Sequence, residues 1–156
     1  MNFDPRAIFE SSIKKELSCD FKDQIAVGQA VAVVRQDDGV DFYRIPLEVN
    51  GRVVGFFDVS IAGAVQRYGL QVTRQADIAR RPPDILELAP GDIWSKAAAV
   101  APPNVTGVGD PQLMSLGAPT KIAWQARMVR VTGEPVTVFV TPGYSWIGGG
   151  SGGEVE

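Results

Sequence analysis

The sequence predicts an α+β fold: an N-terminal helix packed on a four-stranded antiparallel meander, followed by a short helix and a second β-hairpin. Three observations predict this. Four strand-like runs fill residues 29–72, with turn signals at Asp37-Asp38-Gly39, Asn50-Gly51 and Ala62-Gly63 between them. An apolar stripe at helical spacing precedes these runs, and a second helix-and-hairpin pattern follows them. Because the connections are short, consecutive strands should be antiparallel neighbours.

The first helix is expected over residues 4–20. Asp4 is a suitable N-cap, and Pro5 follows at the first helical position, where a missing N–H has no cost. Apolar residues then recur at every fourth position and form one stripe: Phe9, Ile13, Leu17 and Phe21. We expect this stripe to lie across a sheet.

The four strands are expected over residues 29–35, 40–49, 52–61 and 64–72. A two-residue turn at Asn50-Gly51 would pair Val49 with Arg52 and would place the apolar side chains of the two middle strands on opposite faces. A three-residue loop with a bulge at Gly51 pairs Glu48 with Arg52 and keeps both apolar sets on one face. The sequence therefore predicts the bulged register, which pairs Tyr43 with Phe57, Ile45 with Gly55 and Leu47 with Val53.

Two residues in this hairpin, Pro46 and Gly55, limit what can lie next to the strands. Pro46 has no N–H to donate, so we expect part of its strand to lie on an edge or to face a site without a hydrogen bond. Gly55 leaves a gap in the side-chain surface. That gap either accommodates the packing of the helix or allows the close approach of a ligand backbone.

The second half is expected to begin with a connector over residues 74–89. A helix over residues 92–101 follows, with Asp92 as its cap and Pro102-Pro103 as its stop. Residues 104–120 are rich in Gly and Pro and are expected to be irregular. A hairpin then joins residues 121–131 and 136–141, and residues 142–147 form a turn that carries two aromatic side chains.

The domain organisation follows from these segments. Residues 1–147 are expected to form a single α+β domain with lobes at about 1–73 and 90–147, and residues 148–156 a flexible Gly-rich tail. The chain has a two-part rhythm, helix then meander and helix then hairpin. It could be an imperfect duplication, but no residue-by-residue match in the sequence establishes one.

The composition excludes several chemistries. The chain of 156 residues contains no histidine and one cysteine, Cys19, so Ser-His-Asp, Cys-His and His-containing zinc sites cannot be built. Its net charge of −3 gives no general attraction to nucleic acid or to an anionic membrane. We therefore expect a protein that is not an enzyme and has no cofactor or metal. The N-terminus has neither the basic start nor the apolar core of a signal peptide, and one cysteine cannot form an internal disulfide, so we expect the protein to reside in the cytoplasm.

Two groups of aromatic residues are the candidate binding sites. Tyr144 and Trp146 lie in the last predicted turn, where they could anchor a partner, although Trp146 could instead fold back and close the core. In the bulged register, Phe42, Val54 and Phe56 share the sheet face that the first helix leaves open. That face is either covered by the second lobe or forms a groove for a peptide or small molecule.

A helix followed by a four-stranded antiparallel meander resembles the arrangement of cystatin-like and PepSY-like domains over about residues 4–72. The cystatin inhibitory motif Gln-x-Val-x-Gly is not matched, because Gln24-Ile25-Ala26-Val27-Gly28 has valine at its fourth position. No functional residue is therefore carried over. The resemblance implies a binding or inhibitory role.

Three hypotheses about function remain open. The first is a non-enzymatic protein-interaction module of the inhibitor, immunity, adaptor or accessory type, which binds through a sheet edge or the Trp146 loop. The second is a binder of a small apolar ligand, whose pocket between sheet and helices would be lined by Phe42, Phe56, Trp94 and Trp124. The third is a carboxylate-based enzyme, for which no acidic pair stands out in the sequence.

Overall fold

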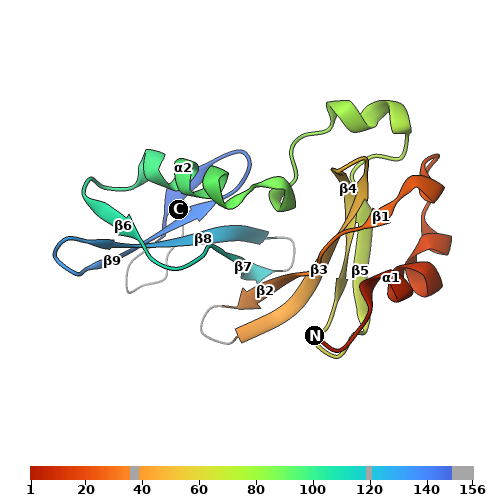
Figure 1. The fold of residues 1–156 in the computed structure, drawn as a ribbon, viewed down its shortest axis with the longest axis horizontal. Coiled ribbons are helices and arrows are strands. Elements are labelled where there is room, and N and C mark those ends of the chain that lie inside the picture. The colour runs from red at the N-terminus through yellow and green to blue at the C-terminus, as the bar shows by residue number, and fades with distance from the viewer. Residues whose placement is uncertain (36–38, 119–120, 149–156) are drawn as a thin grey trace. The chain divides into compact units, whose positions relative to one another are not determined.

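The computed structural model describes residues 1–35, 39–118 and 121–148, and the chain divides into two compact units, Met1–Glu87 and Leu88–Glu156. The described residues contain ten strands and few helical segments, so the fold is α+β (Figure 1). Within each unit the strand pairs are antiparallel. The sheet content is larger than the predicted four-stranded meander and hairpin. In the part of the chain that the structure describes, no helix is long and apolar enough to cross a membrane.

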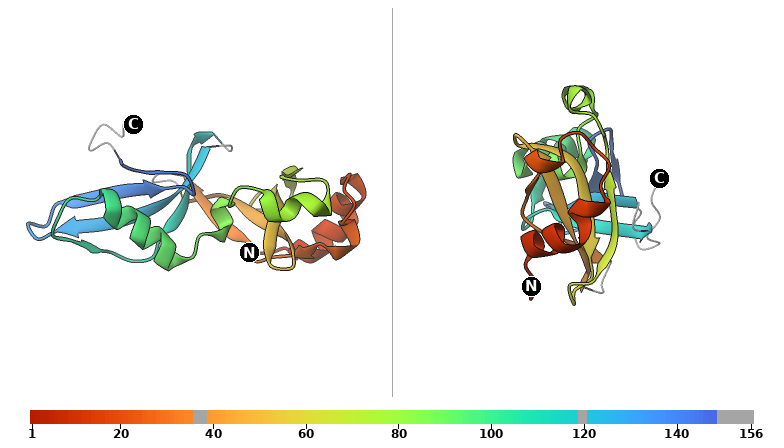
Figure 2. Two further views of the ribbon diagram at one scale, coloured as in Figure 1. Left: turned by 90° about the horizontal axis from the view of Figure 1, so that it is seen from above. Right: turned by 90° about the vertical axis from the view of Figure 1, so that its right-hand side faces the viewer.

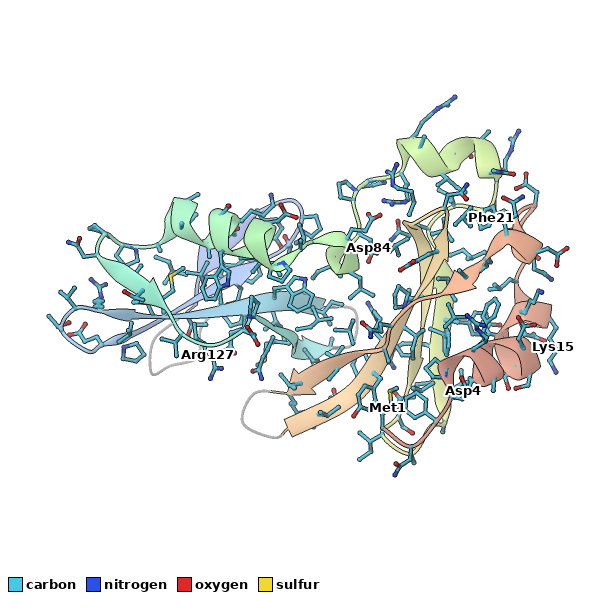
Figure 3. The ribbon with its side chains drawn as sticks, viewed as in Figure 1. Met1, Asp4, Lys15, Phe21, Asp84 and Arg127 are labelled. Atoms are coloured by element: carbon cyan, nitrogen blue, oxygen red, sulfur yellow. The ribbon has the colours of Figure 1, made fainter. Side chains whose placement is uncertain are left out.

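The N-terminal helical segment begins as predicted and ends early. It comprises α1 (Pro5–Ile8), a π-helical turn (Phe9–Ile13) and a 3-10 turn (Lys14–Glu16). The Asp4 carboxylate caps it by accepting a hydrogen bond from Arg6 N at 3.0 Å, and Figure 3 shows Asp4 at the start of this helix. Leu17 already has extended backbone angles, so the predicted helix over residues 4–20 is too long. The apolar stripe is still buried, because Leu17 and Phe21 reach the core from non-helical backbone.

The first unit contains five strands. They are β1 (Ala26–Val27), β2 (Val31–Arg35), β3 (Gly39–Val49), β4 (Arg52–Val59) and β5 (Val65–Leu70). The long strand β3 lies in the middle, with β1 and β2 paired along one side and β4 along the other, and β5 pairs with β4. The core lies between the helical segment and this sheet, where the rings of Phe9 and Phe57 stack 6.3 Å apart. Of the predicted turn at residues 37–39, Asp37 and Asp38 lie outside the described residues.

The β3–β4 register differs from the predicted one. Val49 pairs with Arg52 across a two-residue turn, in which Asn50 and Gly51 have φ angles of 51° and 79°. These angles are those of a type I′ turn, for which Asn-Gly is the preferred sequence, and this local preference overrides the predicted bulge at Gly51.

A bulge does occur in this hairpin, but on β4. Leu47 pairs with Gly55 and Glu48 with Val53, which leaves Val54 as the extra residue. The bulge restores the apolar side chains of both strands to one face, and Ile45 now pairs with Phe57. The need for an extra residue was therefore predicted correctly, whereas its position and all four predicted pairs, including Glu48 with Arg52, were wrong.

Pro46 and Gly55 have structural roles within the sheet. The carbonyl oxygen of Pro46 accepts a hydrogen bond from Gly28 N at 2.9 Å, so its missing N–H faces the junction between β1 and β2 rather than a ladder position. A Cβ atom on Gly55 would lie 2.4 Å from the carbonyl oxygen of Gly69 on β5. The gap at Gly55 is thus filled by the neighbouring strand, and not by the helix or by a ligand.

The segment after β5 belongs to the first unit. Two 3-10 helices form over Gln75–Arg80 and Ile85–Glu87, and the second of these contacts β4. Residues 74–87 of the expected connector therefore have regular turns and tertiary contacts. Only Leu88 and Ala89 separate this segment from the next helix.

The second unit also contains five strands. Its elements are α2 (Pro90–Val100), β6 (Val105–Gly107), β7 (Gln112–Ala118), β8 (Lys121–Arg130), β9 (Pro135–Val140) and β10 (Ser145–Ile147). β8 pairs with β6 and β7 on one side and with β9 on the other, and β10 pairs with β9. α2 lies along one face of this sheet (Figures 1 and 2) and buries Ile93 and Ala97 against it.

Several boundaries in the second unit differ from the predictions. α2 begins at Pro90 rather than Asp92, and Asp92 Oδ2 accepts a hydrogen bond from Ala89 N at 3.1 Å from within the first turn. Of the segment 104–120 that was expected to be irregular, the described residues 104–118 contain β6 and β7, so that prediction was wrong for them. The last predicted turn contains the strand β10. These strands were missed because two of them are only three residues long and all lie among glycines and prolines, so their pairing depends on tertiary contacts.

Candidate functional site

The four candidate binding residues lie in two pairs, one in each unit. Phe42 lies on β3 and Phe56 on β4, whereas Tyr144 directly precedes β10 and Trp146 lies within it. Phe42 is buried at 1% exposure, and Tyr144 is exposed at 65%. The two pairs therefore differ in accessibility and in the chemistry around them.

The pair in the first unit surrounds a buried ion network. Asp58 is fully buried, and its carboxylate accepts two hydrogen bonds of 2.8 Å from Arg44 and one of 2.6 Å from Arg67 Nε. The Arg44 guanidinium lies 4.0 Å from the centroid of the Phe56 ring, and that of Arg67 lies 4.6 Å from the centroid of the Phe42 ring. Both cations thus bind the same carboxylate and also contact an aromatic face.

This network is closed on itself. Buried charges are tolerated when they are paired and hydrogen-bonded, and Asp58 meets both conditions. Val54, which was expected beside these residues, lies instead in the core that faces the helix, because the bulge turns it to that side. The predicted groove of Phe42, Val54 and Phe56 therefore does not form as one surface.

The pair in the second unit is part of an aromatic row. Trp146 lies opposite Phe139 on β9, with ring centroids 5.6 Å apart. Tyr144 stacks on Trp146 at 5.2 Å, with an angle of 28° between the rings. The row lies on the sheet face opposite α2, because Val138 and Val140, which flank Phe139, face the helix core. Figure 3 shows Arg127 on this same side of the unit, away from α2.

The indole of Trp146 is partly buried and leaves one donor unused. Its Nε1–H group is shielded from solvent and has no hydrogen-bond partner among the described residues. A buried donor without a partner costs about 1–3 kcal/mol, and buried Trp N–H groups usually find one. The Trp146 indole N–H is therefore unpaired, whereas the buried Asp58 carboxylate of the first unit accepts three hydrogen bonds.

The strand β10 has a free edge in the described part of the chain, where β9 is its one paired neighbour. The Tyr144 carbonyl accepts a hydrogen bond from Thr141 N at 2.9 Å, and Gly148 N donates to the Thr137 carbonyl at 2.8 Å. Because backbone groups alternate in direction along a strand, the N–H and C=O groups of Ser145 and Ile147 face the free edge. These groups are those that an added strand would bind.

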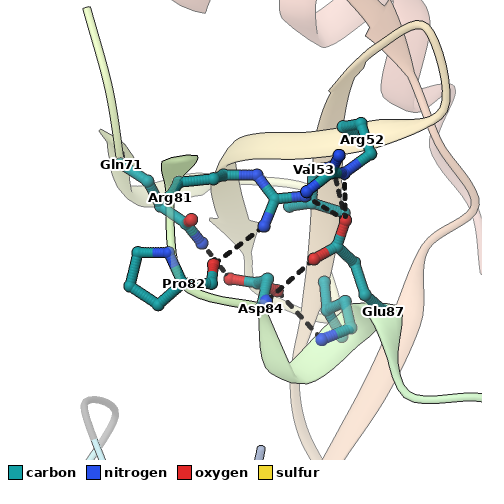
Figure 4. Close-up of polar contacts among 8 residues, drawn as sticks. Arg52, Val53, Gln71, Arg81, Pro82, Asp84 and Glu87 are labelled. Carbon is teal, nitrogen blue, oxygen red and sulfur yellow. Dashed lines mark hydrogen bonds and ion pairs between the residues drawn. The ribbon is translucent and has the colours of Figure 1, made fainter. Parts of the chain in front are cut away.

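A polar network in the first unit was not apparent in the sequence (Figure 4). The Glu87 carboxylate accepts hydrogen bonds from Val53 N at 3.1 Å, from Asp84 N at 2.9 Å and from the buried Arg81 side chain. Asp84 in turn accepts from Leu86 N at 2.9 Å and from the Gln71 side chain. The network attaches residues 81–87 to β4. It could not be predicted, because its members are up to 34 residues apart.

The two carboxyl groups of this network have pKa values that move in opposite directions. Burial raises the pKa of Asp84, and hydrogen bonding from Leu86 N and the charge of Arg44 oppose that shift only in part. Burial also acts to raise the pKa of Glu87, but hydrogen bonds from Asp84 N, Arg81 and Val53 N outweigh it and lower the pKa. Both carboxylates are occupied by hydrogen bonds to the surrounding backbone and side chains, so the arrangement is that of a structural clamp.

The other candidate groups are scattered. Cys19 lies beyond the end of the helix, partly buried against the core of the first unit. Of the four residues expected to line a ligand pocket, Phe42 and Phe56 belong to the first unit, and Trp94 and Trp124 to the second. Across residues 1–35, 39–118 and 121–148, no cluster of three or more acidic or cysteine side chains could hold a metal ion.

Comparison with known proteins gives no relative from which a function could be transferred. No protein-family model, no curated protein and no solved structure matches this chain.

Proposed function

We propose that this protein is a non-enzymatic protein-interaction module, of the inhibitor, immunity, adaptor or accessory type. Its binding surface would consist of the β10 edge and the aromatic row of Phe139, Trp146 and Tyr144. The observation that carries this proposal is the stacked pair of Tyr144 and Trp146 on a strand with a free edge. The proposal includes a cytoplasmic location, which cell fractionation would test.

The mode of binding that this geometry favours is strand addition. An extended segment of a partner would pair with the outward backbone groups of Ser145 and Ile147. Its alternate side chains would then contact the aromatic row, where the exposed Tyr144 ring and the partly buried Trp146 ring offer a large area at little entropic cost. Main-chain pairing would supply affinity, and the rings would supply selectivity.

A quantitative affinity capture from the source lysate tests the proposal, because the wild-type chain and each variant are compared for the same partner. We expect Trp146→Ala and Tyr144→Ala each to reduce partner recovery about tenfold or more, as hot-spot residues do. Tyr68→Ala is the matched control, because Tyr68 is a 43% exposed tyrosine on the other terminal strand, β5. Equal recovery with all three variants would contradict binding at the β10 surface.

A proline substitution separates strand addition from binding by the rings alone. Ile147→Pro removes an N–H that faces the free edge and leaves the β9–β10 hydrogen bonds intact. Ile147→Ala removes the side chain and keeps that N–H. Strand addition predicts a loss of recovery with Ile147→Pro that is much larger than with Ile147→Ala.

The small-ligand alternative has less support in the described residues. A pocket is lined by Arg35, Gly39, Val40 and Asp41, none of which is an aromatic residue expected to contact a ligand. Phe42 is buried beside a paired ion network. We therefore retain protein binding as the proposed function.

A further inference from the structure

The two units have the same order of elements. Each begins with a helical segment and continues with five strands, α1 with β1–β5 and α2 with β6–β10. In each, a long third strand pairs with the first and second strands on one side and with the fourth strand on the other, and the fifth strand pairs with the fourth. The two sheets therefore have one topology.

The strand registers also correspond residue by residue. Consecutive partners across the second, third and fourth strands are Ala32–Tyr43–Val59 in the first unit and Leu113–Trp124–Val140 in the second. Each residue of the second set lies 81 positions after its counterpart, as from Ala32 to Leu113. The pair Ile45–Phe57 corresponds to Ala126–Val138 at the same shift. A chance likeness of topology would not require a constant shift over three strands.

Both helical segments begin at a proline and bury two residues against the sheet of their own unit. Pro5 and Pro90 each occupy the first helical position. In the first unit the buried pair is Phe9 and Ile13 in the π-helical turn that follows α1, and in the second unit it is Ile93 and Ala97 in α2, with the two residues four positions apart in each case. Each core contains the helix-facing side chains of the third and fourth strands of its own unit.

The correspondence is hidden in the sequence because only apolar character is kept. At equivalent positions on the third strand, Tyr43, Ile45 and Leu47 are replaced by Trp124, Ala126 and Met128. Cores tolerate such changes when volume and pattern are kept overall. A comparison of residue identities therefore finds no repeat, whereas a comparison of the strand pairing finds one.

We infer that Met1–Glu87 and Leu88–Glu156 are tandem copies of one α–β–β–β–β–β folding unit, each with its own core. The copies differ in the chemistry of one row of three cross-strand partners. That row is Arg44–Asp58–Arg67 in the first copy and Gln125–Phe139–Trp146 in the second. An ion network thus occupies the row in the first copy, and Gln125 with two aromatic residues occupies it in the second. We assign partner binding to the second copy alone, and this assignment rests on the proposed function.

Hydrogen exchange of the full-length chain, followed by mass spectrometry, tests the part of the inference that gives each copy its own core. Phe57→Leu and Val138→Ala truncate equivalent core positions. Each variant should speed exchange about tenfold or more in the strands of its own copy and leave the other copy within about twofold. A milder equivalent pair, Ile45→Val and Ala126→Gly, serves if either of the first variants fails to fold. Equal acceleration in both copies by both variants would overturn the inference.

Partner recovery tests the assignment of binding separately. Trp146→Ala and Arg67→Ala alter equivalent positions of the two copies. The inference expects a loss of recovery with Trp146→Ala and no loss with Arg67→Ala. An equal loss with both would overturn the assignment to the second copy. If no partner is recovered by the wild-type chain, the proposed function fails, whereas the exchange experiment still decides the repeat.

Discussion

Arg44 and Asp58 lie opposite one another on β3 and β4, and the Arg44 guanidinium donates two hydrogen bonds of 2.8 Å to the Asp58 carboxylate. The paired oxygens and nitrogens form the bidentate geometry that favours arginine over lysine at such sites. Asp58 is inaccessible to solvent, and the Arg44 side chain is 11% exposed. Removal of either partner would therefore leave a buried or largely buried charge unpaired.

Removing the Asp58 carboxylate should destabilise the first unit strongly. Asp58→Ala leaves Arg44 largely buried and without its carboxylate, and breaking a buried ion pair from one side costs about 3–5 kcal/mol. Asp110→Ala, at an exposed position of the second unit, should change the free energy of unfolding by less than about 0.5 kcal/mol. Urea titration of both variants measures the difference. A loss below about 1 kcal/mol for Asp58→Ala would contradict a stabilising role for the network.

Glu87→Gln should make the protein less stable at neutral pH than at acidic pH, relative to wild type. The folded-state pKa of Glu87 lies below its ordinary value of 4.5, so its contribution is present above that value and is lost as the pH falls through the folded pKa. The stability difference between wild type and Glu87→Gln should therefore shrink below about pH 4.5. Denaturant titrations at several pH values measure it, and a difference that does not change with pH would contradict the lowered pKa.

Asp84→Asn should have the opposite pH dependence. The folded-state pKa of Asp84 lies above its ordinary value of 3.8, so its favourable contribution is present below that value and is lost as the pH rises through the folded pKa. Asparagine stays neutral, and the amide of Gln71 can turn to accept its N–H. The variant should therefore gain stability relative to wild type as the pH rises from acidic to neutral. The same titrations as for Glu87 check this, and a gain on acidification would refute it.

Gly55→Ala should destabilise the β4–β5 pairing. The added Cβ would lie 2.4 Å from the Gly69 carbonyl oxygen, and backbone on a paired strand cannot move away at little cost. We expect a loss of about 1–3 kcal/mol in thermal or urea unfolding. Gly91→Ala is the control, because a Cβ there has open space and alanine favours the helix α2 by about 0.5–1 kcal/mol. Equal effects at the two glycines would argue against the close approach.

Trp146→Phe should distinguish the contribution of the Trp146 ring to stability from the cost of its unpaired N–H group. Phenylalanine keeps an aromatic ring between Phe139 and Tyr144 but has no N–H to leave unsatisfied. The free energy of unfolding should be unchanged or higher by up to about 1 kcal/mol, because the buried donor is removed. A loss of more than about 2 kcal/mol would show that the indole N–H has a partner in solution.

The sequence by itself was sufficient for the fold class and for the local signals. The Asp4 cap and the antiparallel hairpin around Asn50-Gly51 both depend on neighbouring residues. Such features involve few contacts that are distant in the chain, so spacing and residue type predict them. Tyr144 and Trp146 were also named as candidate binding residues in this way, and their role stays a prediction, whereas the strand that holds Trp146 was not predicted.

Only the tertiary structure decided the register, the short strands and the correspondence of the two units. The bulge at Val54 lies where it does because two local preferences compete, a type I′ turn and a common apolar face, and packing of the whole sheet resolves them. The partners of Asp58, Arg44 and Arg67, come from strands that meet only after folding. The repeat is visible in the strand register but not in the sequence, because a fold requires apolar character at each core position and leaves the residue identity free to change.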